Sequence, residues 1–284
     1  MGNIIEVTGL TKSYTNFSLE IKNLALPEDC IIGFIGINGA GKTTTIRAIL
    51  GLVGIDSGNV KIFGKDFGNS QYEIKNRIGV VLDEGGFYED LTIAEMKSII
   101  APSYSSWDEN AYRNYLERFS LRPKQKISQI SKGMRMKFAL TLALSHEADL
   151  LIMDEPTSGL DPLVRSELLE IMAEYMKQGG KGVFFSTHIT SDLEKVADML
   201  VLIHDGRIVF KFERDYMLDN FRMIKGDAKA LNAENKKMFL NIQTNDLGFA
   251  GITNKPHEVQ QVMPGVLVEK PSIEDVMLAY IGGG

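Results

Sequence analysis

Residues able to bind a polyphosphate stand close together near the start of the chain. The stretch 36–43 has the spacing G-x-x-x-x-G-K-[ST]. Glycine lets such a loop wrap closely around phosphate oxygens, and its lysine and hydroxyl can reach the terminal phosphates and a Mg²⁺ ion. An apolar run at 31–35 precedes the loop, and apolar residues at helical spacing follow it. We therefore predict a nucleoside triphosphate site. Its loop residues are Asn38, Gly39, Gly41, Lys42, Thr43 and Thr44.

Two adjacent carboxylates provide the second chemical feature. Asp154 and Glu155 follow four apolar residues, so we expect them at the carboxyl end of a parallel strand. A P-loop nucleotide needs an aspartate near its Mg²⁺ ion, which assigns Asp154 to the metal together with Thr43. Glu155 is then free to polarise the attacking water. His188 ends the next predicted strand and is expected to contact the γ-phosphate.

A second anion-binding helix start occurs between the loop and the carboxylates. Ser131, Lys132 and Gly133 open a predicted helix, and the first N–H groups of a helix attract anions. The P-loop already occupies the phosphates of the chain's own nucleotide. We therefore expect this segment to meet a nucleotide bound by a second copy of the chain.

Composition restricts the class of protein. The chain has 284 residues, of which 44% are hydrophobic and 24% charged, as is ordinary for a soluble globular protein. No window approaches the roughly 18 apolar residues of a membrane-spanning helix, and no signal peptide is visible. The single cysteine, Cys30, fits a reducing compartment, so a cytoplasmic location is expected. With a net charge of −6 and no basic stripe, a nucleic-acid partner is not expected.

The elements that must position these residues follow from periodicity and turn signals. Helical patterns between Thr92 and Ser145 form an insertion, with a capping box at Thr92 and Glu95 and a cap at Asp108. Asp161 and Pro162 open the next helix. The predicted strands are 4–7, 17–21, 31–35, one within 54–64, 78–82, 150–154, 182–185, 198–202 and 206–210. Beyond residue 213 we expect strands at 221–224, 238–242, 248–252 and 266–268, and a closing helix from Ser272.

The motifs resemble, in order and spacing, the ATP-binding cassette (ABC) family of transporter ATPases over residues 3–213. The resemblance assigns the Walker A loop to 36–44, the Walker B strand to 150–154, the signature to 130–134, the D-loop to 158–161, the switch histidine to His188 and the A-loop aromatic to Tyr14. By its position alone, Tyr14 is either a base-stacking ring or an ordinary strand-end residue. The resemblance implies that it stacks on adenine, that ATP and Mg²⁺ are bound, and that Asp161 of the D-loop is among the residues that bind ATP.

Two departures separate this chain from the usual pattern of the family. The signature reads Ile130-Ser-Lys-Gly-Met134 in place of Leu-Ser-Gly-Gly-Gln. The glutamine of the Q-loop aligns with Asp83, which can ligate the metal, although a shift of one residue would select Glu84. These variants look like the bacterial subgroup that exports antimicrobial peptides, lantibiotics, drugs or phenol-soluble modulins.

The fold expected is an α/β P-loop NTPase of ABC type, with a mixed sheet core, an antiparallel β subdomain and a helical insertion at about 84–146. Residues 1–213 would form this domain, and 214–284 a small α+β appendage. The resemblance implies an ATP-hydrolysing subunit of an exporter, peripheral on the inner face of the membrane. Its partners would be a second, identical or paralogous ATPase subunit and separate membrane subunits. Near the acidic loop, Phe87, Tyr88 and Trp107 form either the docking surface for these partners or plain core and loop packing.

Two other functions are compatible with parts of the pattern. A soluble ABC ATPase of iron–sulfur cluster assembly would share every motif, so co-purification with a membrane protein would separate it from an exporter. A P-loop kinase would share the phosphate loop but would leave the signature and the D-loop without a role.

Overall fold

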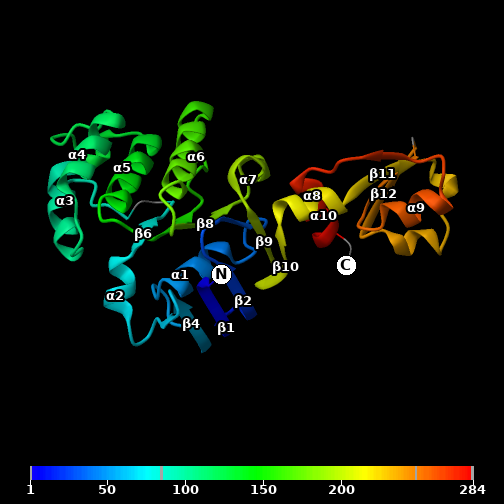
Figure 1. The fold of residues 1–284 in the computed structure, drawn as a ribbon, viewed down its shortest axis with the longest axis horizontal. Helices are drawn as coiled ribbons and strands as arrows, with labels where there is room; N and C mark the ends of the chain where they lie inside the picture. Colours follow the sequence, from blue (N-terminus) through cyan, green and yellow to red (C-terminus); the bar gives the residue numbers. More distant parts are fainter. Residues whose placement is uncertain (1, 84–85, 247, 283–284) are drawn as a thin grey trace.

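The nucleotide motifs lie along a central six-stranded sheet (Figure 1). The structure is a computed structural model that describes residues 2–83, 86–246 and 248–282. The strand order is β10-β9-β3-β8-β7-β6, and all neighbours are parallel except β9 and β10. The strands are β3 (Ile31–Ile35), β6 (Ile78–Val81), β7 (Leu150–Asp154), β8 (Gly182–Thr187), β9 (Met199–His204) and β10 (Arg207–Glu213).

Both faces of this sheet are buried, which explains its nearly continuous apolar strands. Along β7, Leu151 and Met153 face one hydrophobic layer, whereas Leu150 and Ile152 face another. The first layer includes residues of the helical insertion, and the second includes α1 (Lys42–Ile49) and a separate antiparallel sheet. The alternation follows the two-residue period of a strand. Every side chain of β3, β7 and β8 is buried.

A four-stranded antiparallel sheet, in the order β2-β1-β4-β5, covers one of these layers. Its strands are β1 (Asn3–Tyr14), β2 (Phe17–Pro27), β4 (Ser57–Ile62) and β5 (Lys65–Asp66). The strands predicted at 4–7 and 17–21 are too short. The pairing of β1 with β2 continues through polar residues because only alternate side chains, such as Leu10 and Leu24, face the core.

Helices surround the central sheet and form the insertion between β6 and β7. They are α1 (Lys42–Ile49), α2 (Gln71–Asn76), α3 (Ile93–Ile100), α4 (Glu109–Arg118), α5 (Lys132–Leu144), α6 (Pro162–Met176) and α7 (Thr190–Val196), with 3₁₀ turns η1 (Ala101–Ser103) and η2 (Ile127–Gln129). The predicted capping box at Thr92 and Glu95 is confirmed, as is the cap at Asp108. Within the described residues, no helix combines the length and apolar composition needed to cross a membrane.

The last part of the chain forms a third sheet, in the order β12-β13-β11-β14. Its elements are α8 (Arg214–Asn220), β11 (Arg222–Gly226), η3 (Ala228–Ala230), η4 (Asn235–Met238), β12 (Asn241–Asn245), β13 (Gly248–Thr253), α9 (Pro256–Val262), β14 (Leu267–Glu269) and α10 (Ile273–Ile281). The strand predicted at 238–242 begins too early, because Met238 ends the 3₁₀ turn η4 and β12 begins only at Asn241. Asn235 caps the local turn by accepting from Asn232 N–H (2.8 Å) and donating to Ala230 O (2.8 Å), and such bonds compete with strand pairing.

Residues 214–282 contact the preceding part of the chain at α7 and β10. The Ile273 N–H at the start of α10 donates to Glu194 Oε1 of α7 at 3.2 Å. Phe212 of β10 packs its ring against Phe221 and Tyr280, with centroids 5.7 and 6.3 Å away. The mixed sheet, antiparallel sheet, helical insertion and α+β appendage expected from the sequence are therefore confirmed.

Candidate nucleotide-binding site

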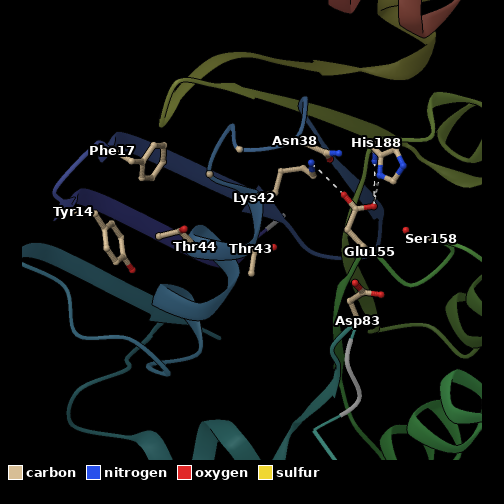
Figure 2. A pocket seen from close by; sticks show the side chains of 12 residues that line it. Tyr14, Phe17, Asn38, Lys42, Thr43, Thr44, Asp83, Glu155, Ser158 and His188 are labelled. Atoms are coloured by element: carbon tan, nitrogen blue, oxygen red, sulfur yellow. Dashed lines mark hydrogen bonds and ion pairs between the residues drawn. The ribbon is translucent and has the colours of Figure 1, made fainter. Parts of the chain in front are cut away.

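A cavity of about 630 Å³ lies at the carboxyl ends of the central strands (Figure 2). Its lining residues are Tyr14, Phe17, Asn38, Gly39, Gly41, Lys42, Thr43, Thr44, Asp83, Glu155, Ser158 and His188. Apart from Phe17 and Ser158, each of these is a residue that the sequence predicts for the site. They come from the β1–β2 turn, the phosphate loop and the ends of β6, β7 and β8.

The phosphate loop has the backbone of an anion-binding site. Gly39 and Gly41 have φ angles of 81° and 110°, a region that L side chains rarely adopt. A Cβ atom on Gly41 would also lie 2.9 Å from the Phe17 ring. No side chain caps α1, so its first N–H groups are available to phosphate oxygens. Lys42 is 5% exposed and donates to Gly36 O at 2.8 Å.

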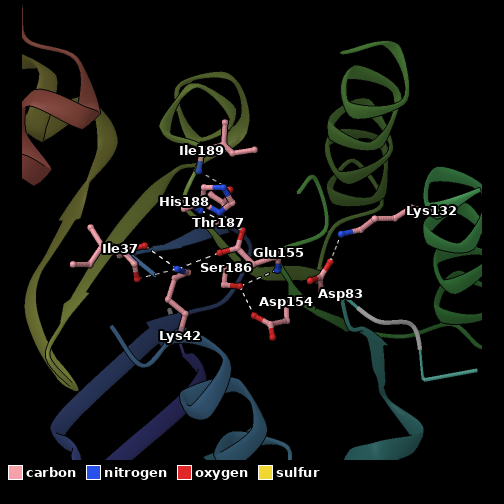
Figure 3. Close-up of polar contacts among 11 residues, drawn as sticks. Ile37, Lys42, Asp83, Lys132, Asp154, Glu155, Ser186, Thr187, His188 and Ile189 are labelled. Carbon is pink, nitrogen blue, oxygen red and sulfur yellow. Dashed lines mark hydrogen bonds and ion pairs between the residues drawn. The ribbon is translucent and has the colours of Figure 1, made fainter. Parts of the chain in front are cut away.

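Glu155 lies between the loop lysine and the switch histidine (Figure 3). Its Oε1 is 3.2 Å from Lys42 Nζ, and its Oε2 is 2.8 Å from His188 Nδ1. The backbone holds this position at φ 49°, where the Glu155 N–H donates to Ser186 Oγ at 2.9 Å. The Glu155 carboxylate therefore contacts Lys42 and His188, and the sequence predicts that both of these side chains bind the phosphates of the nucleotide.

Asp154 lies outside the cavity lining and is 4% exposed. Its Oδ1 accepts a hydrogen bond of 2.6 Å from Ser186 Oγ. Sequence reasoning missed Ser186, although its place next to Asp154 in the parallel β7–β8 pairing offers a signal. Mg²⁺ prefers oxygen ligands, so the hydroxyl of Thr43 and the carboxylates of Asp154 and Asp83 fit such an ion chemically.

Asp83, at the end of β6, forms an ion pair with Lys132 of the same chain. The distance between Lys132 Nζ and Asp83 Oδ1 is 2.6 Å, and the side chains are 45% and 41% exposed (Figure 3). The alternative residue Glu84 lies outside the described residues. The structure thus brings together a residue predicted for the chain's own metal and one predicted for a partner's phosphate.

The residues predicted to complete a partner's site gather in a different cavity, of about 450 Å³. Ser131, Lys132, Gly133 and Asp161 all line it. Ser131 caps α5 by accepting from Met134 N–H at 3.2 Å, and Asp161 caps α6 by accepting from Leu163 and Val164 N–H. Apart from Asp154, which lines neither, the predicted site residues that the structure describes are therefore divided between these two cavities of one chain.

Two aromatic rings stand at the end of the first cavity away from Glu155 (Figure 2). Tyr14 is 48% exposed, and its ring centroid is 6.3 Å from that of Phe17. Sequence reasoning missed Phe17. Its signal is the short turn after Tyr14, which makes the two residues cross-strand partners. Their exposed ring surface can accept the flat face of a base.

Comparison with known proteins connects this geometry to a family. Residues 19–158 match the family described as ABC transporter. The chain is 33% identical to the bacitracin transport ATP-binding protein of Bacillus licheniformis, over 100% of this chain and 99% of that protein. It is 31% identical to the lantibiotic transport ATP-binding protein of Streptococcus pyogenes, over 75% of this chain and 92% of that protein.

A solved structure supports the same assignment. The structure described as the ATP binding subunit of an ABC transporter has a TM-score of 0.68 and 31% identity, and covers 76% of this chain and 92% of its own. The expected P-loop fold of ABC type is thereby confirmed. The chain belongs to the ABC transporter family and is an ATP-binding, ATP-hydrolysing protein of that family.

Proposed function

We propose that the chain powers a membrane exporter of peptides or drugs, and that it acts as a head-to-tail dimer of ATPase subunits. The relatives named for bacitracin and lantibiotic transport support a peptide cargo. The bacitracin relative aligns along the whole chain, including residues 214–284. These names favour transport over a soluble role in iron–sulfur cluster assembly.

The observation that carries the dimer is the division of the site between two cavities. Lys42 and Thr43 line one cavity, whereas Ser131 and Gly133 line the other. A second chain in the opposite orientation brings its signature cavity over the phosphate loop of the first. ATP then lies between the two chains, in two equivalent sites.

Within each site the chain's own residues have separate roles. Tyr14 and Phe17 contact the adenine, and Lys42 and the N-terminus of α1 hold the phosphates. Thr43, Asp154 and Asp83 would hold Mg²⁺, which neutralises charge on the phosphates when bound. Glu155 accepts the proton of the attacking water, and His188 orients Glu155. Lys42 Nζ lies 3.2 Å from Glu155 Oε1. When Lys42 binds phosphate in place of Glu155, His188 remains as the side chain that contacts the carboxylate.

A separate apolar groove of about 610 Å³ suits a membrane subunit. Leu52 and Tyr72 line it and are 54% and 75% exposed. Leu82 also lines it and directly precedes Asp83, which lines the nucleotide cavity. We propose that an apolar cytoplasmic segment of the membrane subunit docks here, which would hold the chain at the inner face of the membrane. Phe87 and Trp107, considered above for docking, pack against the core of the insertion, whereas Tyr88 is 67% exposed.

Replacing Glu155 by glutamine tests the proposed function. Glu155→Gln keeps the shape of the side chain but cannot accept a proton, so ATP should bind while phosphate release falls to near background. Size-exclusion chromatography with ATP should then show a dimer. Glu73→Gln, which alters an exposed ion pair with Lys65, is the matched control. Unchanged hydrolysis would remove Glu155 from the role of base, and an ATP-bound monomer would contradict the dimer.

A further inference from the structure

A buried ion pair joins the helix after the D-loop to the helix after the switch histidine. Arg165 Nε of α6 donates to Asp192 Oδ1 of α7 at 2.5 Å, and Arg165 Nη2 donates to Ser191 Oγ at 2.7 Å. The Asp192 side chain is fully buried, and that of Arg165 is 25% exposed. A guanidinium that donates from two nitrogens fixes direction as well as distance.

This ion pair closes a ring of contacts around the catalytic carboxylate. The Arg165 N–H donates to Asp161 O at 3.0 Å, so Arg165 lies in the first turn after the D-loop. The D-loop in turn begins at Ser158, whose N–H donates to Glu155 O at 3.1 Å. On the other side, α7 begins two residues after His188, which contacts Glu155. These contacts form a closed path that leads from Glu155 through the D-loop to Arg165, from Arg165 to Asp192, and from α7 through His188 back to Glu155.

The position of α7 depends strongly on this contact. The helix has seven residues and no side-chain cap, and a helix this short needs tertiary contacts to be stable. Among the described residues, Asp192 Oδ2 has no hydrogen-bond partner. Arg165 is therefore the main compensation for a buried charge, and removing one partner of such a pair is strongly unfavourable.

Other residues on and next to α7 contact the hydrophobic core and the C-terminal segment. Leu193 and Ala197 are buried in the core shared with α10, and Glu194 accepts from the Ile273 N–H. In Figure 1, α7 stands between α6 and the C-terminal elements. Asp192 and Ser191 are thus the residues of α7 that hydrogen-bond Arg165 of the D-loop helix, and Asp192 is the charged one.

We propose that Arg165 and Asp192 are positioning residues that hold His188 against Glu155 and tie it to the D-loop. This inference rests on the proposed roles of Glu155 and His188. In the dimer, a D-loop that moves as the partner closes would carry Arg165, α7 and His188 with it. Neither residue lines the nucleotide cavity, so the pair acts on turnover and not on ATP binding.

The test compares turnover with nucleotide affinity in Asp192→Asn and Arg165→Gln. A misplaced catalytic group can cost up to a hundredfold in rate, so we expect turnover to fall roughly ten- to hundredfold. The dissociation constant for ATP should stay within about twofold of that of the unmodified protein, since neither side chain lines the cavity. Glu174→Gln, which breaks the bidentate pair of α6 with Arg118, is the control and should leave turnover unchanged.

A double-mutant cycle with His188→Ala separates positioning from a merely structural role. If the pair acts through His188, Asp192→Asn should not lower the residual single-turnover rate of His188→Ala any further. A fall by the same factor in both backgrounds would overturn the proposal. If Asp192→Asn does not fold, Arg165→Lys, which keeps the charge and loses the fork, enters the cycle instead.

A parallel measurement of Glu155→Gln distinguishes this inference from the proposed function. If Glu155→Gln abolishes turnover while the Asp192 and Arg165 variants retain it, only the positioning role fails. If Glu155→Gln keeps its turnover, the role of Glu155 as base fails, and the cycle with His188 still decides whether the ion pair positions the histidine.

Discussion

Lys132 Nζ lies 2.6 Å from Asp83 Oδ1 of the same chain, so two residues of different nucleotide motifs neutralise each other. Both residues are departures from the usual pattern of the family, which has glycine and glutamine at these positions. In the proposed dimer, Lys132 must leave Asp83 to reach the partner's phosphate. Both side chains are more than 40% exposed, and an exposed ion pair is weak, so ATP can compete for the lysine.

Lys132→Met should weaken ATP-dependent dimerisation without changing ATP binding by the single chain. Lys132 does not line the first cavity, and methionine keeps much of the apolar stem. A hydrogen bond to a charged group contributes about 1.5–3 kcal/mol, so we expect dimerisation to weaken at least tenfold. Analytical ultracentrifugation in the Glu155→Gln background measures it. Lys97→Met removes an ion pair with Glu109 inside the insertion and is the control. Equal dimerisation of both variants would place Lys132 outside the interface.

Gly41→Ala should destabilise the protein and abolish ATP binding. The φ angle of 110° costs an L residue about 1–2 kcal/mol, and the new Cβ would lie 2.9 Å from Phe17. Urea denaturation gives the stability, and titration with a fluorescent ATP analogue gives the binding. Gly64→Ala is the matched control, with φ 72° and open space around the new atom. Gly64→Ala should lose a similar amount of free energy of unfolding, because its backbone also has a positive φ angle, but it should bind ATP normally. Normal ATP binding by Gly41→Ala would show that the loop adapts.

Much of the site could be predicted because each functional residue follows a short apolar run. Asp154 and His188 end buried parallel strands, and the phosphate loop follows another, so the sheet itself brings them together. The pairing of Asp83 with Lys132 had no such signal, because it depends on how the insertion packs against β6. Phe17 and Ser186 were missed for the same reason: their roles come from cross-strand neighbours and not from motif spacing.

The buried histidine of the insertion gives the protein a pH-dependent stability. His146 Nδ1 and Nε2 lie 3.0 Å from Leu142 O and 3.1 Å from Ile78 O, and its ring stacks on Tyr104. Burial lowers the pKa of His146, outweighing the two carbonyl contacts that raise it. As the pH falls below about 6.5, the ordinary pKa of histidine, the unfolded chain therefore binds more protons than the folded protein. The contribution of His146 is present above this pH and is lost as pH falls toward the folded pKa.

We therefore expect the free energy of unfolding to fall more steeply between pH 7.5 and 5.5 in the unmodified protein than in His146→Phe. Phenylalanine keeps a ring against Tyr104 and cannot titrate. The variant should also be less stable at pH 7.5, because the neutral imidazole donates one hydrogen bond to a backbone carbonyl and phenylalanine donates none. Urea denaturation at both pH values measures the two slopes. Equal slopes would assign the pH dependence to other groups.

Phe221→Ala tests whether residues 214–284 unfold together with the nucleotide-binding part. Phe221 is 2% exposed, and its ring contacts those of Phe212 and Tyr280, so it lies where the two parts meet. Truncating a buried phenylalanine costs about 3–5 kcal/mol. Tyr216→Ala is the control, since Tyr216 touches Phe212 but is 52% exposed, and this variant should lose about 1 kcal/mol or less of stability.

If the two parts share a core, the intrinsic fluorescence of Trp107 in the insertion should follow one urea transition, and its midpoint should move to lower urea in Phe221→Ala. If that midpoint stays in place while circular dichroism shows a separate early transition, the C-terminal segment is an independently folding domain, and its contact with α7 contributes little to the stability of the ATPase core.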